Sequence, residues 1–253
     1  MMIDSHAHIY LSDFEEDLED VILKSKEEGV EKIYMPNIDS STIESMHKVE
    51  DLYSNCISMM GLHPCYVKEN YRQELEVVAS HLKNRKYAAI GEIGIDLYWD
   101  KTFAEYQKDA FSYQINLAKD HGLAFVIHSR ESLDQTIEMV SKAQDGNLKG
   151  IFHCFNGTEE QGKRIIDLGF YLGIGGVVTY KNAGVDKVVS QLPLSSMVLE
   201  TDSPYLSPGP KRTKRNDPSR LTLVVDKLES IMEEEREKII KITSQNCDDI
   251  FLY

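Results

Sequence analysis

The chain has 253 residues, of which 42% are hydrophobic and 28% are charged, and its formal net charge is −14. These values are ordinary for a globular protein long enough to bury a substantial core. The negative charge excludes a broad phosphate-binding surface, so any contact with nucleic acid needs bound cations or a local basic segment such as Lys-Arg-Thr-Lys-Arg at 211–215.

The chain lacks the signals of membrane insertion or export. No apolar run approaches the roughly 20 residues that span a bilayer, and the first twenty residues carry acidic side chains instead of a basic and apolar leader. Its four cysteines, which have no C-x-x-C spacing, are Cys56, Cys65, Cys154 and Cys247. We therefore expect reduced thiols, a cytoplasmic location and no membrane partner.

Short apolar segments alternate with helical patterns along the chain. Eight segments have the composition of strands, at 2–9, 32–38, 56–63, 88–95, 124–129, 149–155, 170–175 and 197–202. Gly29, Gly122 and Gly169 each follow a helical stretch, where a left-handed C-terminal residue is expected. Capping-box spacing at 41–44 and 158–161 predicts two helix starts.

Eight strand–helix units in this order predict an α/β fold, a (β/α)8 TIM barrel. Much of each strand is apolar on both faces, as expected for parallel strands covered by helices. We expect residues 1–253 to form a single domain, in which apolar residues of 219–251 form extra C-terminal helices. A doubly wound open sheet has the same alternation and stays an alternative.

Histidines and carboxylates gather at or near the ends of six predicted strands. They are His6, His8, His63, Glu92, His128, His153, Glu200 and Asp202. In a parallel barrel these ends open on one rim, where so many polar groups need a charge-compensating partner. A metal centre supplies one. The other three histidines lie in helical stretches and are expected to be structural, namely His47, His81 and His121.

This set of donors exceeds what one tetrahedral ion needs and suits two divalent ions bridged by a carboxylate. Glu92 is the natural bridge, because Gly91 and Gly94 leave room beside it. Asp202, on the last strand next to the first, is placed to bind an ion and to take a proton from the attacking water.

Six segments in order carry a family resemblance: D-S-H-A-H, G-L-H-P, G-E-I-G-I-D, I-H-S-R, H-C-F-N-G and E-T-D-S-P-Y-L. Together they closely resemble the TatD family of metal-dependent hydrolases, and the match covers nearly the whole chain. The resemblance implies an amidohydrolase-like barrel and deoxyribonuclease activity of the 3′-to-5′ exonuclease type, with a water activated by two metal ions.

The resemblance also implies roles for individual residues. Its two ligand sets would be His6, His8, Glu92 and Asp202 for one ion, and Glu92, His128 and His153 for the other. Asp202 would be the general base, and His63 would face the scissile phosphate or the leaving group. Glu200 would orient a ligand. Basic side chains for more distant phosphate contacts would be Arg130, Arg212, Lys214 and Arg215.

Two departures from the family pattern are visible. Cys65 follows the proline at a position where relatives often have histidine, and the segment at 216–218 reads Asn-Asp-Pro where Asn-Glu-Pro is usual. Neither position is in the expected ligand sets. Cys65 leaves the substrate preference open, because a neutral thiol cannot act on phosphate as an imidazolium does.

The leading hypothesis is a monomeric phosphodiesterase that uses two Mg, Mn or Zn ions on DNA ends or oligonucleotides. The alternative keeps the metals but hydrolyses a carbon-centred ester or amide, as a D-aminoacyl-tRNA deacylase does. Glu92 favours phosphorus, because many related binuclear amidohydrolases have a modified lysine at that strand. A non-enzymatic nucleic-acid-binding protein is a third reading, which the negative charge disfavours.

Overall fold

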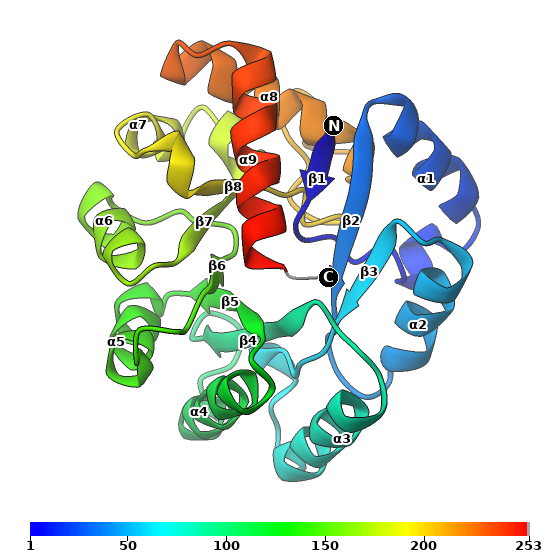
Figure 1. Ribbon diagram of the computed structural model, residues 1–253, viewed down its shortest axis with the longest axis vertical. Coiled ribbons are helices and arrows are strands. Elements are labelled where there is room, and N and C mark those ends of the chain that lie inside the picture. Colours follow the sequence, from blue (N-terminus) through cyan, green and yellow to red (C-terminus); the bar gives the residue numbers. More distant parts are fainter. Residues whose placement is uncertain (252–253) are drawn as a thin grey trace.

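The strands of the computed structural model, which describes residues 1–251, form a parallel ring (Figure 1). One sheet contains β1 (Met2–Asp4), β2 (Val30–Pro36) and β3 (Cys56–Met59). The other contains β4 (Ala89–Asp96), β5 (Ala124–Arg130), β6 (Gly150–Phe152), β7 (Tyr171–Ile174) and β8 (Met197–Leu199), again in chain order.

Backbone hydrogen bonds join the two sheets at both seams. Between β3 and β4, the Met60 N–H donates to the Ala89 carbonyl oxygen at 3.1 Å. Between β1 and β8, the Ser5 N–H donates to the Leu199 carbonyl oxygen at 2.9 Å. The first strand thus pairs with the last as well as with β2, which an open sheet does not allow. The predicted α/β barrel architecture is confirmed, and the open-sheet alternative is wrong.

The helices lie around the outside of the strands, except α9, which lies across one end (Figure 1). They are α1 (Leu18–Glu27), α2 (Ile43–Leu52), α3 (Tyr71–Asn84), α4 (Ala104–His121), α5 (Leu133–Ala143), α6 (Glu159–Asp167), α7 (Val185–Val189), α8 (Leu221–Met232) and α9 (Arg236–Ile250). The two C-terminal helices expected within 219–251 are present as α8 and α9. None of the helices within residues 1–251 combines the length and the apolar composition needed to cross a bilayer.

The end of α9 closes the barrel at the amino ends of the strands. Ile250 and Phe251 are buried in a cluster with apolar residues that begin the strands, such as Ile57 and Ala124. The Phe251 ring lies 4.3 Å from the Tyr34 ring, centroid to centroid. With this end filled by side chains, the opposite rim, at the carboxyl ends of the strands, is left for polar chemistry.

Six predicted strands are too long at their carboxyl ends: 32–38 and 170–175 by one or two residues, and 2–9, 56–63, 149–155 and 197–202 by three or more. The chain leaves the sheet before the polar residues, and two of them take left-handed backbone angles, with φ 49° at Cys154 and 56° at Asp202. His63 likewise precedes a 3-10 turn at Pro64–Tyr66. On these strands the functional side chains therefore lie in the first residues beyond the ladder, whereas Glu92 and His128 lie within β4 and β5.

Of the two expected capping boxes, only one forms. Thr158 and Gln161 satisfy each other's backbone N–H groups at the start of α6. The box at 41–44 is wrong, because the Ser41 hydroxyl and N–H both donate to Asp39 Oδ1, and α2 begins only at Ile43. The three glycines predicted to end helices all have left-handed φ: Gly29, Gly122 and Gly169.

A buried polar cluster ties the first strand to the segment after the last. Asp4 Oδ1 accepts hydrogen bonds from the N–H groups of His6 and Thr201, at 3.2 and 3.0 Å. Asp4 Oδ2 bonds to the Thr201 hydroxyl at 2.6 Å, and that hydroxyl also bonds to Ser203 at 2.7 Å. Asp4, Thr201 and Ser203 are essentially inaccessible to water. This cluster fixes the position of His6 relative to Asp202.

We predict that Thr201→Val lowers the free energy of unfolding by about 1–3 kcal/mol, because it leaves buried polar atoms of Asp4 and Ser203 without a partner. Urea denaturation of the metal-free protein measures the change. The matched control is Thr213→Val at an exposed position, which should change stability by less than about 0.5 kcal/mol. Equal effects of the two variants would contradict this role for the cluster.

Candidate metal centre

The first group at the rim consists of His6, His8, Glu92 and Asp202. The Nε2 atoms of His6 and His8 lie 3.2 Å apart, and Glu92 Oε2 is 3.1 Å from the first and 3.5 Å from the second. Asp202 Oδ1 is 3.8 Å from His6 Nε2 and 3.7 Å from His8 Nε2. Side chains from two strand ends and from the interior of β4 thus aim at one point.

The other oxygen of Glu92 faces a second group. Glu92 Oε1 lies 2.8 Å from His128 Nδ1, 3.4 Å from His63 Nε2 and 3.9 Å from His153 Nε2. His153 Nε2 is also 3.8 Å from Asp202 Oδ1. The two oxygens of one buried carboxylate therefore divide the histidines into two sets, as a bridging ligand requires.

The glycines beside Glu92 have a packing role that differs from the expected one. A Cβ on Gly94, which has φ +143°, would lie 2.0 Å from the His128 carbonyl oxygen. A Cβ on Gly91 would lie 3.0 Å from the Val126 side chain. These glycines allow β4 to approach β5 closely, so the expectation that they make room for ions is wrong.

Hydrogen bonds behind His8 fix its tautomer. The Tyr10 hydroxyl donates to the Pro36 carbonyl oxygen at 2.5 Å, so its oxygen accepts from His8 Nδ1 at 2.9 Å. The hydrogen of the neutral ring therefore sits on Nδ1 and the lone pair on Nε2, which faces the centre. This is the arrangement that outer-shell partners give to metal-binding histidines.

His153 makes an ion-pair contact with Glu200, whose Oε1 lies 3.0 Å from His153 Nδ1. The Glu200 carboxylate also accepts the Cys154 N–H at 2.6 Å. A Cβ on Gly173 would lie 2.2 Å from Glu200 Oε2, so only glycine leaves space for this carboxylate. Glu200 thus lies behind His153 and leaves Nε2 directed at the centre, as the sequence led us to expect.

His128 lies between two carboxylates. Its Nδ1 faces Glu92, and its Nε2 lies 2.9 Å from Asp96 Oδ2. Asp96 Oδ1 accepts the N–H groups of Tyr98 and Trp99, at 2.9 and 3.0 Å. Burial opposes a charged ring, but hydrogen bonds from both nitrogens to Asp96 and Glu92 raise the pKa of His128 above its usual value. A metal ion at the centre would take the place of the hydrogen on Nδ1, while the Nε2–H stays bonded to Asp96.

His63 has the opposite tautomer. Its Nδ1 accepts the Cys65 N–H at 3.1 Å, so the hydrogen of the neutral ring is on Nε2. This N–H group points toward Glu92 Oε1 and into the mouth of the barrel. His63 can therefore donate a hydrogen bond there, and in this orientation its ring offers no lone pair to a metal ion.

Burial and neighbouring charges shift the acidities of the centre. Burial lowers the pKa of His6 well below its usual value, which keeps the ring neutral. Burial opposes a charged Glu92, but His63 and His6 hold its pKa well below the usual range. Burial raises the pKa of Asp202 to about 6. Protons and divalent cations thus compete for the same donor atoms.

The donor set fits a metal centre. Two ligands of one tetrahedral Zn²⁺ lie about 3.3 Å apart when each bond is about 2.0–2.1 Å. The four donor atoms of the first group are separated by 3.1–3.8 Å over the measured pairs. Imidazoles and carboxylates are also the ligand types that Zn and Mn sites use. Carboxylates raise the pKa of His153 to about 10 and also raise that of His128 against the effect of burial, so a metal ion would have to replace a proton on each of these rings.

The basic residues differ in what they contact. Arg215 pairs with Asp17 at 2.6 and 2.9 Å, so its charge already has a carboxylate partner. Arg130 lies over the Tyr98 ring, 3.9 Å from guanidinium carbon to centroid, and Arg212 lies over the Tyr180 ring at 4.3 Å. Lys214 is exposed in the loop after β8.

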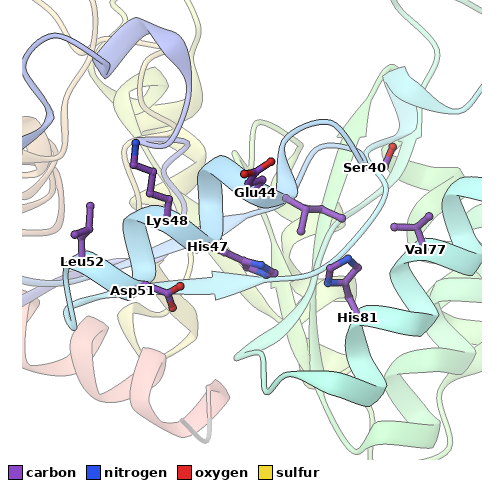
Figure 2. A pocket seen from close by; sticks show the side chains of 9 residues that line it. Ser40, Glu44, His47, Lys48, Asp51, Leu52, Val77 and His81 are labelled. Carbon is purple, nitrogen blue, oxygen red and sulfur yellow. The ribbon is translucent and has the colours of Figure 1, made fainter.

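The three remaining histidines lie on helices, as expected. His47 on α2 and His81 on α3 flank a pocket on the outer side of the barrel (Figure 2). His47 Nε2 bonds to the Tyr87 hydroxyl at 2.8 Å. His121 is the last residue of α4. None of the three belongs to the groups of donor atoms at the rim.

Sequence reasoning missed the partners that hold these rings. Asp96 stands in the quoted segment G-E-I-G-I-D and shares a strand face with Glu92, since the two are four positions apart. That spacing was a usable signal. Asp4 and Tyr10 likewise alternate with His6 and His8, but nothing in the sequence indicated their bonds to the distant Thr201 and Pro36 carbonyl.

A parallel barrel with imidazoles and carboxylates converging at its carboxyl rim defines the class of barrel-type metal-dependent hydrolases. Comparison with known proteins agrees. A family model described as TatD related DNase matches residues 3–252. The chain belongs to the TatD family, and the resemblance found in the sequence is confirmed.

Individual relatives support the assignment. The metal-dependent hydrolase YabD of Bacillus subtilis is 34% identical over 252 residues, which cover 99% of each chain. The crystal structure of YjjV, a TatD homologue from Escherichia coli, superposes with a TM-score of 0.95 at 28% identity, covering 100% of this chain and 98% of the other. A TatD-family hydrolase from Entamoeba histolytica has the same fold, with a TM-score of 0.84 at 23% identity over 99% and 97% of the chains.

We predict that a divalent cation raises the melting temperature of the chelator-treated protein, because bound metal stabilises the folded state. At a hundred times the dissociation constant the gain is about 2.7 kcal/mol. Thermal melts with EDTA and then with excess Mn²⁺ or Zn²⁺ measure it. Glu92→Gln, which removes the shared carboxylate, should abolish most of the shift, and a shift of equal size in that variant would contradict this picture of the centre.

Proposed function

We propose that this metal-dependent hydrolase of the TatD family is a deoxyribonuclease that removes nucleotides from DNA ends with two divalent metal ions. One observation carries the proposal. Glu92 presents its two oxygens to two separate sets of imidazoles, which suits a pair of ions a few ångströms apart. Two-metal sites of this kind are used for in-line displacement at phosphorus.

The proposed ligand sets are those that the family resemblance implies, and the convergence of their side chains supports them. His6, His8, Glu92 and Asp202 would hold one ion, and Glu92, His128 and His153 would hold the other. Bound there, the two ions would polarise the phosphodiester and supply a water of lowered pKa. Mg, Mn and Zn remain the candidate ions.

The chain's own residues would manage the protons. The Asp202 carboxylate, with a pKa raised to about 6 by burial, is suited to accept the proton of the attacking water near neutral pH. The His63 Nε2–H points into the same space and can donate to a phosphoryl oxygen or to the leaving oxygen. Asp202, Glu92 and His63 are therefore the proposed catalytic residues.

The test is hydrolysis of end-labelled oligonucleotides by the purified protein with Mg²⁺ or Mn²⁺. We expect release of mononucleotides, and a loss of activity of about 10²–10⁴-fold in Asp202→Asn with the fold retained. Asp226→Asn, in an exposed ion pair on α8, is the matched control and should keep full activity. If the wild-type protein cleaves no DNA but cleaves aminoacyl esters, the carbon-centred alternative replaces the proposal.

A second prediction separates the role of His63 from that of a ligand. His63→Ala should lower kcat for DNA by about 10²-fold, since it removes a donor to the reacting phosphate. Metal affinity, measured by titration, should stay within about twofold of wild type. His81→Ala on α3 is the control for loss of an imidazole. A large fall in metal affinity would instead make His63 a ligand.

A further inference from the structure

Three side chains beside the centre form an exposed cluster to which the proposed mechanism gives no role. Tyr98 and Trp99 follow β4, and Arg130 ends β5; we call them the β4–β5 aromatic cluster. The Arg130 guanidinium carbon lies 3.9 Å from the Tyr98 ring centroid and 5.3 Å from that of Trp99. The Tyr98 and Trp99 rings pack edge to face, with their centroids 4.9 Å apart.

The cluster leaves a large aromatic surface open to water. Trp99 is 69% exposed and Tyr98 is 49% exposed, and Trp99 is the single tryptophan of the chain. The exposure of so much indole surface in a loop that its own contacts hold in place points to a ligand.

The loop that carries the rings is held by partners on both sides. Asp96 accepts both N–H groups of Tyr98 and Trp99. Lys68 pairs with Asp100 at 3.0 Å, and Lys101 lies 3.5 Å from Glu131. A ligand that stacks on Trp99 therefore meets a surface whose backbone is already ordered, which lowers the entropic cost of binding.

A single carboxylate connects the cluster to the metal centre. Asp96 Oδ2 bonds to His128 Nε2, and Asp96 Oδ1 bonds to the backbone of the cluster. The backbone of the cluster is thus separated from the His128 ring by the Asp96 carboxylate alone.

The charge of the cluster agrees with a nucleotide as its occupant. No carboxylate of residues 1–251 forms an ion pair with Arg130, whose guanidinium lies over the tyrosine ring instead. Its N–H groups remain available at the edge of that plane for a phosphate, while Trp99 offers a face to a base. Aromatic stacking with a cationic side chain is how proteins hold single-stranded nucleic acid without reading its sequence.

We propose that the β4–β5 aromatic cluster binds a nucleobase of the substrate next to the scissile phosphodiester, with Trp99 as the stacking surface and Arg130 beside the neighbouring phosphate. The proposal rests on the proposed phosphodiesterase function. It makes Trp99 and Arg130 positioning residues that determine how the substrate lies.

The tryptophan fluorescence of the wild-type protein tests this directly, because all of it comes from Trp99. The protein with Mg²⁺ is titrated with a short single-stranded oligonucleotide whose bonds are phosphorothioates, and with the same backbone lacking bases. We expect saturable quenching by the first, and binding at least about fivefold weaker for the second, the lower limit for one stacked base. Equal binding of the two, or an absence of quenching, would overturn the proposal.

Hydrolysis provides the second readout. Trp99→Leu should lower kcat/KM on the base-containing oligonucleotide by at least about fivefold and leave the rate on a base-free phosphodiester unchanged. Trp99→Tyr should restore most of the loss, because stacking is retained. Tyr113→Leu, at a 40% exposed position on α4, is the matched control. Equal losses on both substrates would contradict a stacking role.

The two proposals fail in different ways. If the wild-type protein hydrolyses no phosphodiester of either kind, the proposed function is wrong. The titration still decides whether Trp99 stacks on a base, because it does not depend on hydrolysis.

Discussion

The site depends on one buried carboxylate, beside which lies no lysine or arginine of residues 1–251. Glu92 is 2% exposed, and its neighbours are the imidazoles of His6, His8, His63, His128 and His153. A charge in such a place is costly unless cations or protons compensate it. The rest of the rim is arranged to satisfy this one group.

The side chains that compensate the Glu92 charge come from distant parts of the chain, and the barrel topology brings these parts together. His6 and Asp202 come from opposite ends of the sequence, and they meet because β1 is bonded to both β2 and the segment after β8. Hydrogen bonds between Asp4 and Thr201 hold the two segments together next to the metal centre. Tyr10, Glu200 and Asp96 then set the rings of His8, His153 and His128 from behind. The contacts that close the barrel and pack its rim therefore also orient the proposed ligands.

Much of this was predictable from the sequence, and the failures have physical causes. Alternating strands and helices predicted the barrel, and polar residues at strand ends predicted the rim. The exact strand ends were not predictable, because the left-handed backbone at Asp202 and Cys154 is imposed by tertiary contacts and not by local propensity. The pairing of Arg215 with Asp17 joins residues 198 positions apart, so a basic segment that looks free in the sequence is partly neutralised in the fold.

The proposed substrate is a polyanion, and long-range attraction would not bring it to this protein, since a net charge of −14 repels phosphate. Affinity then has to come from interactions that do not depend on the total charge. In the proposed function, metal ions would provide one, because their charge is concentrated at the reacting phosphate. The proposed aromatic stacking would provide another, because it acts on bases. Arg130 and Arg212 lie on tyrosine rings, in contrast with Arg215 on its aspartate. A guanidinium that lies on an aromatic ring is held in place, but its charge is not neutralised. The charge therefore remains available to a ligand near the mouth of the barrel, although the protein as a whole is acidic.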